Sequence, residues 1–322
     1  MFGFHPALLP LALFGGVLVQ DARPSQPPSP PSETSTIALK PVDERMTVPV
    51  QIAGAGPYRF VIDTGAERTV ISRELAGTLG LAAGRHVNVT AMSGTSRVGT
   101  VVIPSLSLSS VPGIGAIQAP ALSADHLGGQ GLLGIDTLKD HKVTLDFDAD
   151  SMTVTPSVYR KRTEPKARDE IVVRAKSQFG QLIVTDADFD GKAIRVVIDT
   201  GSAVTIGNEA LRRLVSGASG RMSPLTLISA TGGEVALRHA MVERVRVGGV
   251  AFQDLTIAFA DVPPFERFGL LKRPAMLLGM GALRSFRRVD IDFTNREVRF
   301  RMPRDGRRGY RCSQLVARSC AA

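Results

Sequence analysis

The tripeptide Asp-Thr-Gly occurs twice in this 322-residue chain, and each copy ends an apolar run. The first copy lies at residues 63–65 and the second at residues 199–201. β-Branched residues favour strands, and an aspartate followed closely by glycine favours a tight turn. We therefore expect each aspartate to project from the end of a strand. A single copy would fit an ordinary strand and turn, but two copies in matching surroundings indicate a duplication.

Further motifs repeat in the same order after each copy. Short β-rich runs flank a glycine-containing turn at residues 87–102 and again at residues 226–237, which predicts two hairpins. An apolar-apolar-glycine segment follows in each half, at residues 132–134 and at residues 277–279. A chain of this length is expected to form two domains, so the repeat predicts two lobes of similar construction.

Two carboxylates held close together can share one proton and act on one water molecule. On the motifs above, the chain resembles the aspartic peptidases, and within them the retropepsin-like branch in the tandem single-chain form of bacterial exported proteins. The resemblance covers residues 46–154 and 171–302. It implies an all-β fold of two tandem retropepsin-like (pepsin-like) β-barrel lobes with short helices, and an active site at the lobe interface.

The resemblance also implies roles for individual residues. Asp63 and Asp199 are the expected catalytic pair, one from each lobe. The residues expected to brace the site follow them in the chain: Thr64, Gly65, Thr200, Gly201 and Ser202. The residues expected to form substrate-binding flaps, with turns at 93–95 and 231–233, are Met92, Ser93, Gly94 and Thr95 in the first half and Ala230, Thr231, Gly232 and Gly233 in the second.

The two halves differ directly after the Asp-Thr-Gly copies, where Ala66 stands in the first and Ser202 in the second. A hydroxyl at this position can donate to the neighbouring carboxylate and favour its charged form. We therefore expect Asp199 to be the ionised member of the pair and Asp63 the protonated one. The pH optimum of such a site is expected to be acidic.

Two further features depart from the family pattern. Neither predicted flap carries a tyrosine, so we expect the flaps to contact substrate mainly through their backbone. The apolar-apolar-glycine segment is followed by Asp136 in the first half, whereas Gly281 stands at the matching position in the second. Packing behind the two aspartates is therefore expected to differ.

The N-terminus is predicted to be a targeting segment, because the apolar run at residues 7–19 has the length of a signal-peptide core and is short for a membrane span. Export to the periplasm or secretion is the expected consequence, and a retained membrane anchor stays open. The expected organisation is a signal peptide or anchor at 1–22, a Pro/Ser-rich linker at 23–45, an N-terminal lobe at 46–157, a basic linker at 158–169, a C-terminal lobe at 170–303 and a basic tail at 304–322.

Charge and the remaining reactive residues narrow the function classes. The net charge is +9, and the basic tail is either a solvated segment or a contact for an anionic envelope surface. Export argues against a nucleic-acid partner. The histidines show no ligand spacing, so no metal and no cofactor are expected. Cys312 and Cys320 are expected to form a disulfide in an oxidising compartment, with free thiols as the alternative.

Three functions remain from the sequence. The first is an exported, monomeric aspartic endopeptidase whose partner is a peptide or protein substrate. The second is a catalytically silent peptide-binding protein of the same fold in the cell envelope. The third is a structural envelope protein that binds through its basic tail. The intact Asp-Thr-Gly in both halves favours the first.

Overall fold

The computed structural model describes residues 46–108, 111–217 and 220–303, and all of them belong to one unit of the chain. The expected signal peptide or anchor, the Pro/Ser-rich linker, the basic tail and both cysteines lie outside the described residues. In the described ranges, no helix is both long enough and apolar enough to cross a membrane.

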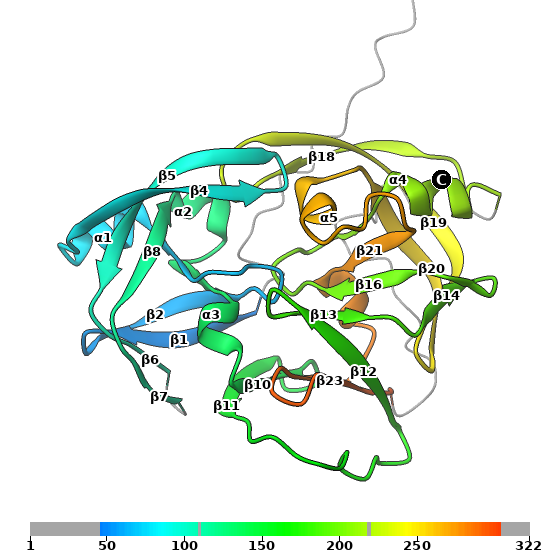
Figure 1. The fold of residues 1–322 in the computed structure, drawn as a ribbon, viewed down its shortest axis with the longest axis horizontal. Helices are drawn as coiled ribbons and strands as arrows, with labels where there is room; N and C mark the ends of the chain where they lie inside the picture. Colours follow the sequence, from blue (N-terminus) through cyan, green and yellow to red (C-terminus); the bar gives the residue numbers. More distant parts are fainter. Residues whose placement is uncertain (1–45, 109–110, 218–219, 304–322) are drawn as a thin grey trace, which may run out of the picture. The chain divides into compact units, whose positions relative to one another are not determined.

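The described part of the first half forms a nine-stranded sheet with short helices (Figure 1). The sheet has the strand order β4-β5-β8-β3-β9-β2-β1-β6-β7. Apolar side chains at alternate strand positions, such as Phe60, Ile71 and Leu106, are fully buried against one another. The elements are β1 (Thr47–Ile52), β2 (Ala55–Ile62), β3 (Val70–Ser72), α1 (Arg73–Thr78), β4 (Ala83–Ala91), β5 (Gly94–Ile103), β6 (Leu106–Leu108), β7 (Val111–Ile114), β8 (Ile117–Leu122), α2 (Ala124–Leu127), β9 (Gly131–Leu133) and α3 (Ile135–Leu138).

The second half belongs to a 14-stranded sheet within the described residues, with the order β11-β10-β22-β23-β12-β13-β16-β21-β17-β20-β19-β14-β15 and with β18 paired to β19. Its elements are β10 (His141–Asp146), β11 (Ser151–Pro156), β12 (Glu170–Gln178), β13 (Gln181–Val184), β14 (Ala187–Phe189), β15 (Lys192–Ala193), β16 (Arg195–Ile198), β17 (Thr205–Gly207), α4 (Glu209–Val215), β18 (Ser223–Ile228), β19 (Glu234–Val247), β20 (Val250–Phe259), α5 (Pro263–Arg267), β21 (Ala275–Leu278), α6 (Met280–Leu283), β22 (Arg288–Asp292) and β23 (Glu297–Arg301). The predicted all-β fold of two tandem lobes with short helices is confirmed.

The two lobes share one arrangement around the strand that ends at each aspartate. In the first lobe, β2 pairs in parallel with β9, and β9 pairs in antiparallel with β3. In the second lobe, β16 pairs in parallel with β21, and β21 pairs in antiparallel with β17. The two leucines of each apolar-apolar-glycine segment are the last residues of β9 and β21. They therefore lie directly beside the strands that carry the aspartates.

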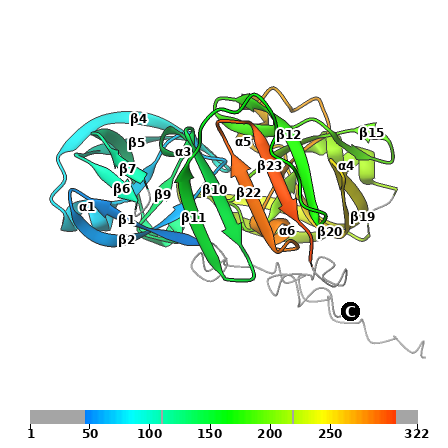
Figure 2. The same ribbon diagram turned by 90° about the horizontal axis from the view of Figure 1, so that it is seen from below.

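The last strand pair of the first half joins the sheet of the second. Strand β10 pairs in antiparallel with β22 (Figure 2). Leu145 lies opposite Val289 in this pairing. Both residues are completely buried, and so is Phe300 on the neighbouring β23. A continuous sheet and core thus connect the two lobes that carry the Asp-Thr-Gly copies.

Buried charges on this connecting sheet are paired. The guanidinium of Arg299 donates to Glu297 at 2.6 Å and to Glu170 at 3.0 Å. The charged state of Arg299 is favoured because these carboxylates raise its pKa against the opposing effect of burial. On the linker between β11 and β12, Arg160 donates to Asp292 at 2.9 Å. The basic linker predicted at 158–169 is therefore tied to the sheet by this arginine.

Candidate active site

Asp63 and Asp199 occupy matching positions in the two lobes. Each follows the last residue of an inner strand, β2 or β16, and each main-chain N–H donates to the neighbouring apolar-apolar-glycine segment. Asp63 donates to the Leu133 carbonyl at 3.0 Å, and Asp199 donates to the Leu278 carbonyl at 3.0 Å. These bonds fix the start of both Asp-Thr-Gly turns.

The glycine of each turn lies against the aspartate of the other lobe. A Cβ atom added to Gly65 would lie 2.8 Å from Oδ1 of Asp199, and one added to Gly201 would overlap Cγ of Asp63. Only glycine leaves room for this approach. Asp199 is buried and Asp63 is half-buried, so the two carboxylates meet in a partly enclosed space between the lobes.

The threonines form a reciprocal set of hydrogen bonds across the interface. The main-chain N–H of Thr64 donates to Oγ1 of Thr200 at 3.1 Å, and the N–H of Thr200 donates to Oγ1 of Thr64 at 3.1 Å. Each hydroxyl donates in turn to the carbonyl that precedes the other aspartate, Thr64 to Ile198 at 2.8 Å and Thr200 to Ile62 at 2.6 Å. Both side chains are buried, so these bonds lie in a low-dielectric setting where losing one is costly.

Ser202 does not act on the aspartate as expected. Its hydroxyl donates to the Val204 carbonyl at 2.8 Å and accepts from the Val204 N–H at 3.3 Å, so its single proton is directed to the main chain. The expectation that it donates to Asp199 is therefore wrong, because the main chain two residues on accepts the hydroxyl proton in a local turn. In the first lobe, the main-chain N–H of Ala66 donates to Asp63 at 3.0 Å.

Both predicted flaps are hairpins, made by β4 with β5 and by β18 with β19 (Figure 1). In the first, Ala91 pairs with Gly94, so Met92 and Ser93 form the turn, one residue earlier than expected. In the second, Ile228 pairs with Glu234. The positive φ of +90° at Gly232 explains a glycine in that turn.

The tips of the two flaps touch each other. The N–H of Ser93 contacts the hydroxyl of Ser229 at 3.4 Å, and the Ser93 hydroxyl lies 3.3 Å from that of Thr231. A Cβ added to Gly233 would lie 2.5 Å from the hydroxyl oxygen of Ser93. The sequence did not single out Ser229, since only the long-range approach of the hairpins gives it a role.

Two family models match the chain, one in each half. The model described as "gag-polyprotein putative aspartyl protease" matches residues 48–140, and the model described as "Aspartyl protease" matches residues 185–282. The chain belongs to the retropepsin-like aspartic proteases, with two tandem lobes. A comparison with curated proteins finds no match.

In this tandem aspartic protease, a cavity of about 200 Å³ lies between the flaps and the two aspartates. Both halves line it mainly with apolar side chains. The residues include Val70, Val89, Met92, Leu122 and Leu132 from the first half and Val197, Leu227, Ala230, Phe268 and Leu277 from the second. Of the expected flap residues, Met92 and Ala230 line the cavity, whereas Ser93, Thr231 and Gly233 meet at the flap contact and Gly94 and Thr95 lie in β5.

Besides the two aspartates, polar residues of both halves line this cavity, including Ser202 and Ser229 of the second half. Asp125 and His126, on the short helix α2, line it in the first half, and the sequence did not indicate them. A Cβ added to Gly232 would lie 2.6 Å from Cε1 of His126, so the second flap rests on this histidine. In the described residues, no group of three or more His, Cys, Asp or Glu side chains is placed to hold a metal ion.

Proposed function

We propose that this protein is an exported aspartic endopeptidase in which Asp63 and Asp199 act together on one water molecule. One observation carries the proposal. The glycine of each Asp-Thr-Gly turn packs against the aspartate of the other lobe, and both carboxylates line a single cavity beneath two flaps. An apolar cavity with a few convergent polar groups is typical of a ligand site.

The reaction follows from two carboxylates that share one proton. Close like charges disfavour the doubly ionised pair, so the pair holds one proton in its active form. The charged carboxylate takes a proton from water as the water oxygen attacks the carbonyl carbon of the peptide, and the protonated one donates to the carbonyl oxygen. The tetrahedral intermediate then collapses, the C–N bond breaks, and a proton passes to the leaving nitrogen.

The surrounding residues support this chemistry in distinct ways. The threonine hydrogen bonds keep the two turns in register, so that the carboxylates stay at a productive separation. The apolar lining displaces water and strengthens the electrostatic interactions within the cavity. The contact between the flap tips suggests that a substrate enters when the tips separate.

The decisive test is cleavage of a random peptide pool across acidic to neutral pH, read by mass spectrometry. The unmodified protein should cleave the pool, and Asp63→Asn and Asp199→Asn should each lose at least about 100-fold in kcat/KM while still binding peptide. Asp188→Asn is a matched control, since Asp188 pairs with Arg246 on the surface. Peptide binding without cleavage at any pH would instead favour the silent binding protein.

Export is part of the proposal and rests on the apolar run at residues 7–19. Sequencing the N-terminus of the mature protein after expression in a bacterial host tests it. Removal of a segment near residue 22 supports export by a signal peptide, whereas an intact N-terminus in the membrane fraction supports an anchor. Deleting residues 304–322 and measuring binding to anionic vesicles tests the envelope contact of the tail.

A further inference from the structure

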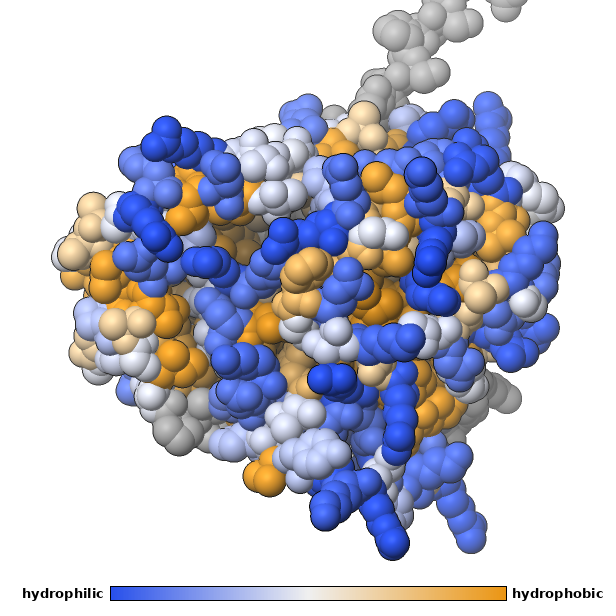
Figure 3. All heavy atoms as spheres, in the orientation of Figure 1, coloured by the Kyte–Doolittle hydropathy of each residue, from blue (hydrophilic) through white to orange (hydrophobic). Residues whose placement is uncertain are grey.

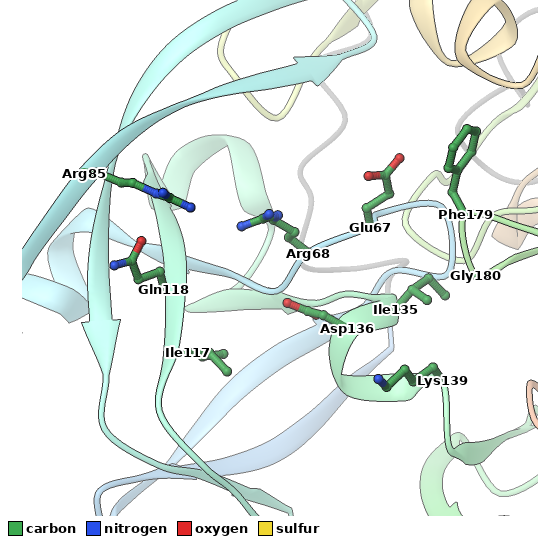
Figure 4. Close-up of a pocket in the computed structure, with 10 residues that line it drawn as sticks. All are labelled: Glu67, Arg68, Arg85, Ile117, Gln118, Ile135, Asp136, Lys139, Phe179 and Gly180. Carbon is green, nitrogen blue, oxygen red and sulfur yellow. The ribbon is translucent and has the colours of Figure 1, made fainter.

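Besides the cavity of the two aspartates, the molecule has a second hollow, of about 820 Å³, whose lining residues are drawn in Figure 4. Two segments of the chain contribute residues to both the cavity and the hollow. Gly65 and Ala66 line the cavity, and the next two residues, Glu67 and Arg68, line the hollow. On strand β4, Val89 and Thr90 line the cavity, whereas Arg85 lines the hollow. Two segments of the chain therefore connect the lining of the cavity to the lining of the hollow, although no residue lines both.

Three basic side chains, Arg68, Arg85 and Lys139, line this hollow. Arg68 and Arg85 point into the same space from two different segments, with Gln118 beside Arg85 and Lys139 on the floor (Figure 4). In the described residues, none of the three cations forms an ion pair with an acid. Hydrophilic side chains border a hollow on this face of the molecule, below the flap hairpins (Figure 3).

The two acids at the hollow are already engaged. Glu67 forms an ion pair with Arg267 of the other lobe, with an Nη2–Oε2 distance of 2.6 Å. Asp136 accepts two hydrogen bonds from Thr69 through one oxygen, each at 2.8 Å. Of the two acids, only Asp136 has no cationic partner among the described residues. The three cations Arg68, Arg85 and Lys139 therefore leave the hollow with a net positive charge.

Both lobes build the far wall of the hollow. The turn between β12 and β13 places Phe179 and Gly180 there, and the guanidinium of Arg267 lies 4.7 Å from the centre of the Phe179 ring. A Cβ added to Gly180 would overlap Ile135 of the first lobe, so the turn packs tightly against it. This fixed wall gives the hollow a defined shape.

Building on the proposed peptidase function, we propose that this hollow is a distal subsite that binds an acidic side chain of the peptide substrate. Arg68 and Arg85 are the specificity-determining residues, since guanidinium groups bind carboxylates through paired, charge-assisted hydrogen bonds. Arg85 and Val89 are four residues apart on one strand, or about 13 Å at about 3.3 Å per residue. An extended peptide covers this distance in about four residues, so the acidic residue stands three to five positions from the cleaved bond.

The test compares peptides that share one apolar core taken from the peptide-pool profile. A glutamate or a glutamine is placed three, four or five positions from the cleaved bond, on either side. At low salt, glutamate at the best position should raise kcat/KM about 10-fold over glutamine, and added salt should reduce this gain. The double variant Arg68→Gln/Arg85→Gln should bring the two peptides level while cleaving the short core peptide at the normal rate.

The controls separate this inference from the proposed function. Arg97→Gln removes the same charge from strand β5, outside the hollow, and should keep the preference for glutamate. If the short core peptide is not cleaved, the peptidase proposal fails, and the subsite is then read from the binding of the same peptides by fluorescence anisotropy. Equal values for glutamate and glutamine at every position, or a preference that survives the double variant, would overturn the subsite.

Discussion

In the first lobe the segment behind Asp63 carries Asp136, whereas in the second lobe Gly281 occupies the matching place behind Asp199. One contact is the same in both lobes. The hydroxyl of Thr69 accepts a hydrogen bond from the Gly134 N–H at 3.1 Å, and the hydroxyl of Thr205 accepts one from the Gly279 N–H at 3.2 Å. The first lobe has an additional contact, because the carboxylate of Asp136 also accepts a hydrogen bond from the Thr69 N–H. The threonine-glycine contact is therefore common to both lobes, and the carboxylate contact is particular to the first.

Where the lobes face each other, they are nearly identical. The reciprocal bonds of Thr64 and Thr200 have equal N–H to Oγ1 distances of 3.1 Å. Away from this interface the halves differ, in Ala66 against Ser202 and in the polar residues of the cavity. The comparison suggests that pairing of two turns constrains the interface, while each half is free to differ around it.

The largest expected difference between the lobes concerns the two glycines. Gly201→Ala should lower kcat/KM by about 100-fold, because the new methyl group displaces Asp63 and a shift of about 1 Å at a reacting group can cost that much. Gly65→Ala should lower kcat/KM less, since its added Cβ would lie 2.8 Å from the nearest atom of Asp199. Gly77→Ala is the control, because no heavy atom lies within 4 Å of its added Cβ. Equal losses of kcat/KM in Gly201→Ala and Gly65→Ala would contradict this difference between the lobes.

Asp136→Ala should sharpen the comparison at the level of stability. The change removes the acceptor of the Thr69 N–H and should lower the free energy of unfolding by about 1 to 3 kcal/mol. Asp136→Asn keeps an oxygen acceptor and should cost less. Urea unfolding of the three proteins measures the difference. If Asp136→Ala matches the unmodified protein, the carboxylate does not support the first lobe.

Two half-buried histidines, His239 and His141, predict a smaller, pH-dependent difference in stability. Burial lowers the pKa of His239 in β19, whereas the same effect of burial on the pKa of His141 in β10 is opposed by the charge of Asp140. A lowered folded-state pKa means that the unfolded chain binds the proton better. Stability is therefore lost as the pH falls below about 6.5, by at most about 1.4 kcal/mol per pH unit for one group.

Replacing each histidine checks this difference. His239→Gln should flatten the dependence of unfolding free energy on pH between 7 and 5 more than His141→Gln does, because burial acts there without an opposing charge. Urea midpoints at several pH values provide the measurement. If the unfolding free energy of either variant depended more steeply on pH, protonation of that histidine would stabilise the folded protein, contrary to the effect of burial on its pKa.

The smallest effect is expected at Ser202. Since its hydroxyl bonds to Val204, Ser202→Ala should leave the acidic limb of the pH profile of kcat/KM in place. The loss of this partly exposed hydrogen bond should cost less than about 1 kcal/mol of stability. Ala66→Ser is the reverse change in the first lobe. A clear move of the acidic limb to higher pH in Ser202→Ala would restore the role first expected for the serine.

The sequence predicted the parts of the site that depend on local patterns. A β-branched run followed by Asp-Thr-Gly places Asp63 and Asp199 at strand ends, and a glycine-containing turn between short β runs places the flaps to within one residue. The bonding partner of Ser202 escaped prediction, because it depends on the path of the loop over the next two residues. A pattern of residue types does not determine that path.

Long-range contacts account for the rest. Ser229 acquires its role through Ser93, which is 136 positions away, and the basic hollow gathers Arg68, Arg85 and Lys139 from three separate segments. Asp125 and His126 sit on a helix of four residues that has no sequence signature of its own. Their positions follow from the packing of whole hairpins and loops against one another, which is not encoded in any short stretch.

The central claim is that one chain supplies both halves of one peptidase site. Mixing Asp63→Asn with Asp199→Asn at high concentration tests it most directly, because each variant retains the aspartate that the other lacks. The account predicts that the mixture stays as inactive as either variant alone, at least about 100-fold below the unmodified protein in kcat/KM. Cleavage activity that returns on mixing would show that the two aspartates come from different chains and would contradict the claim.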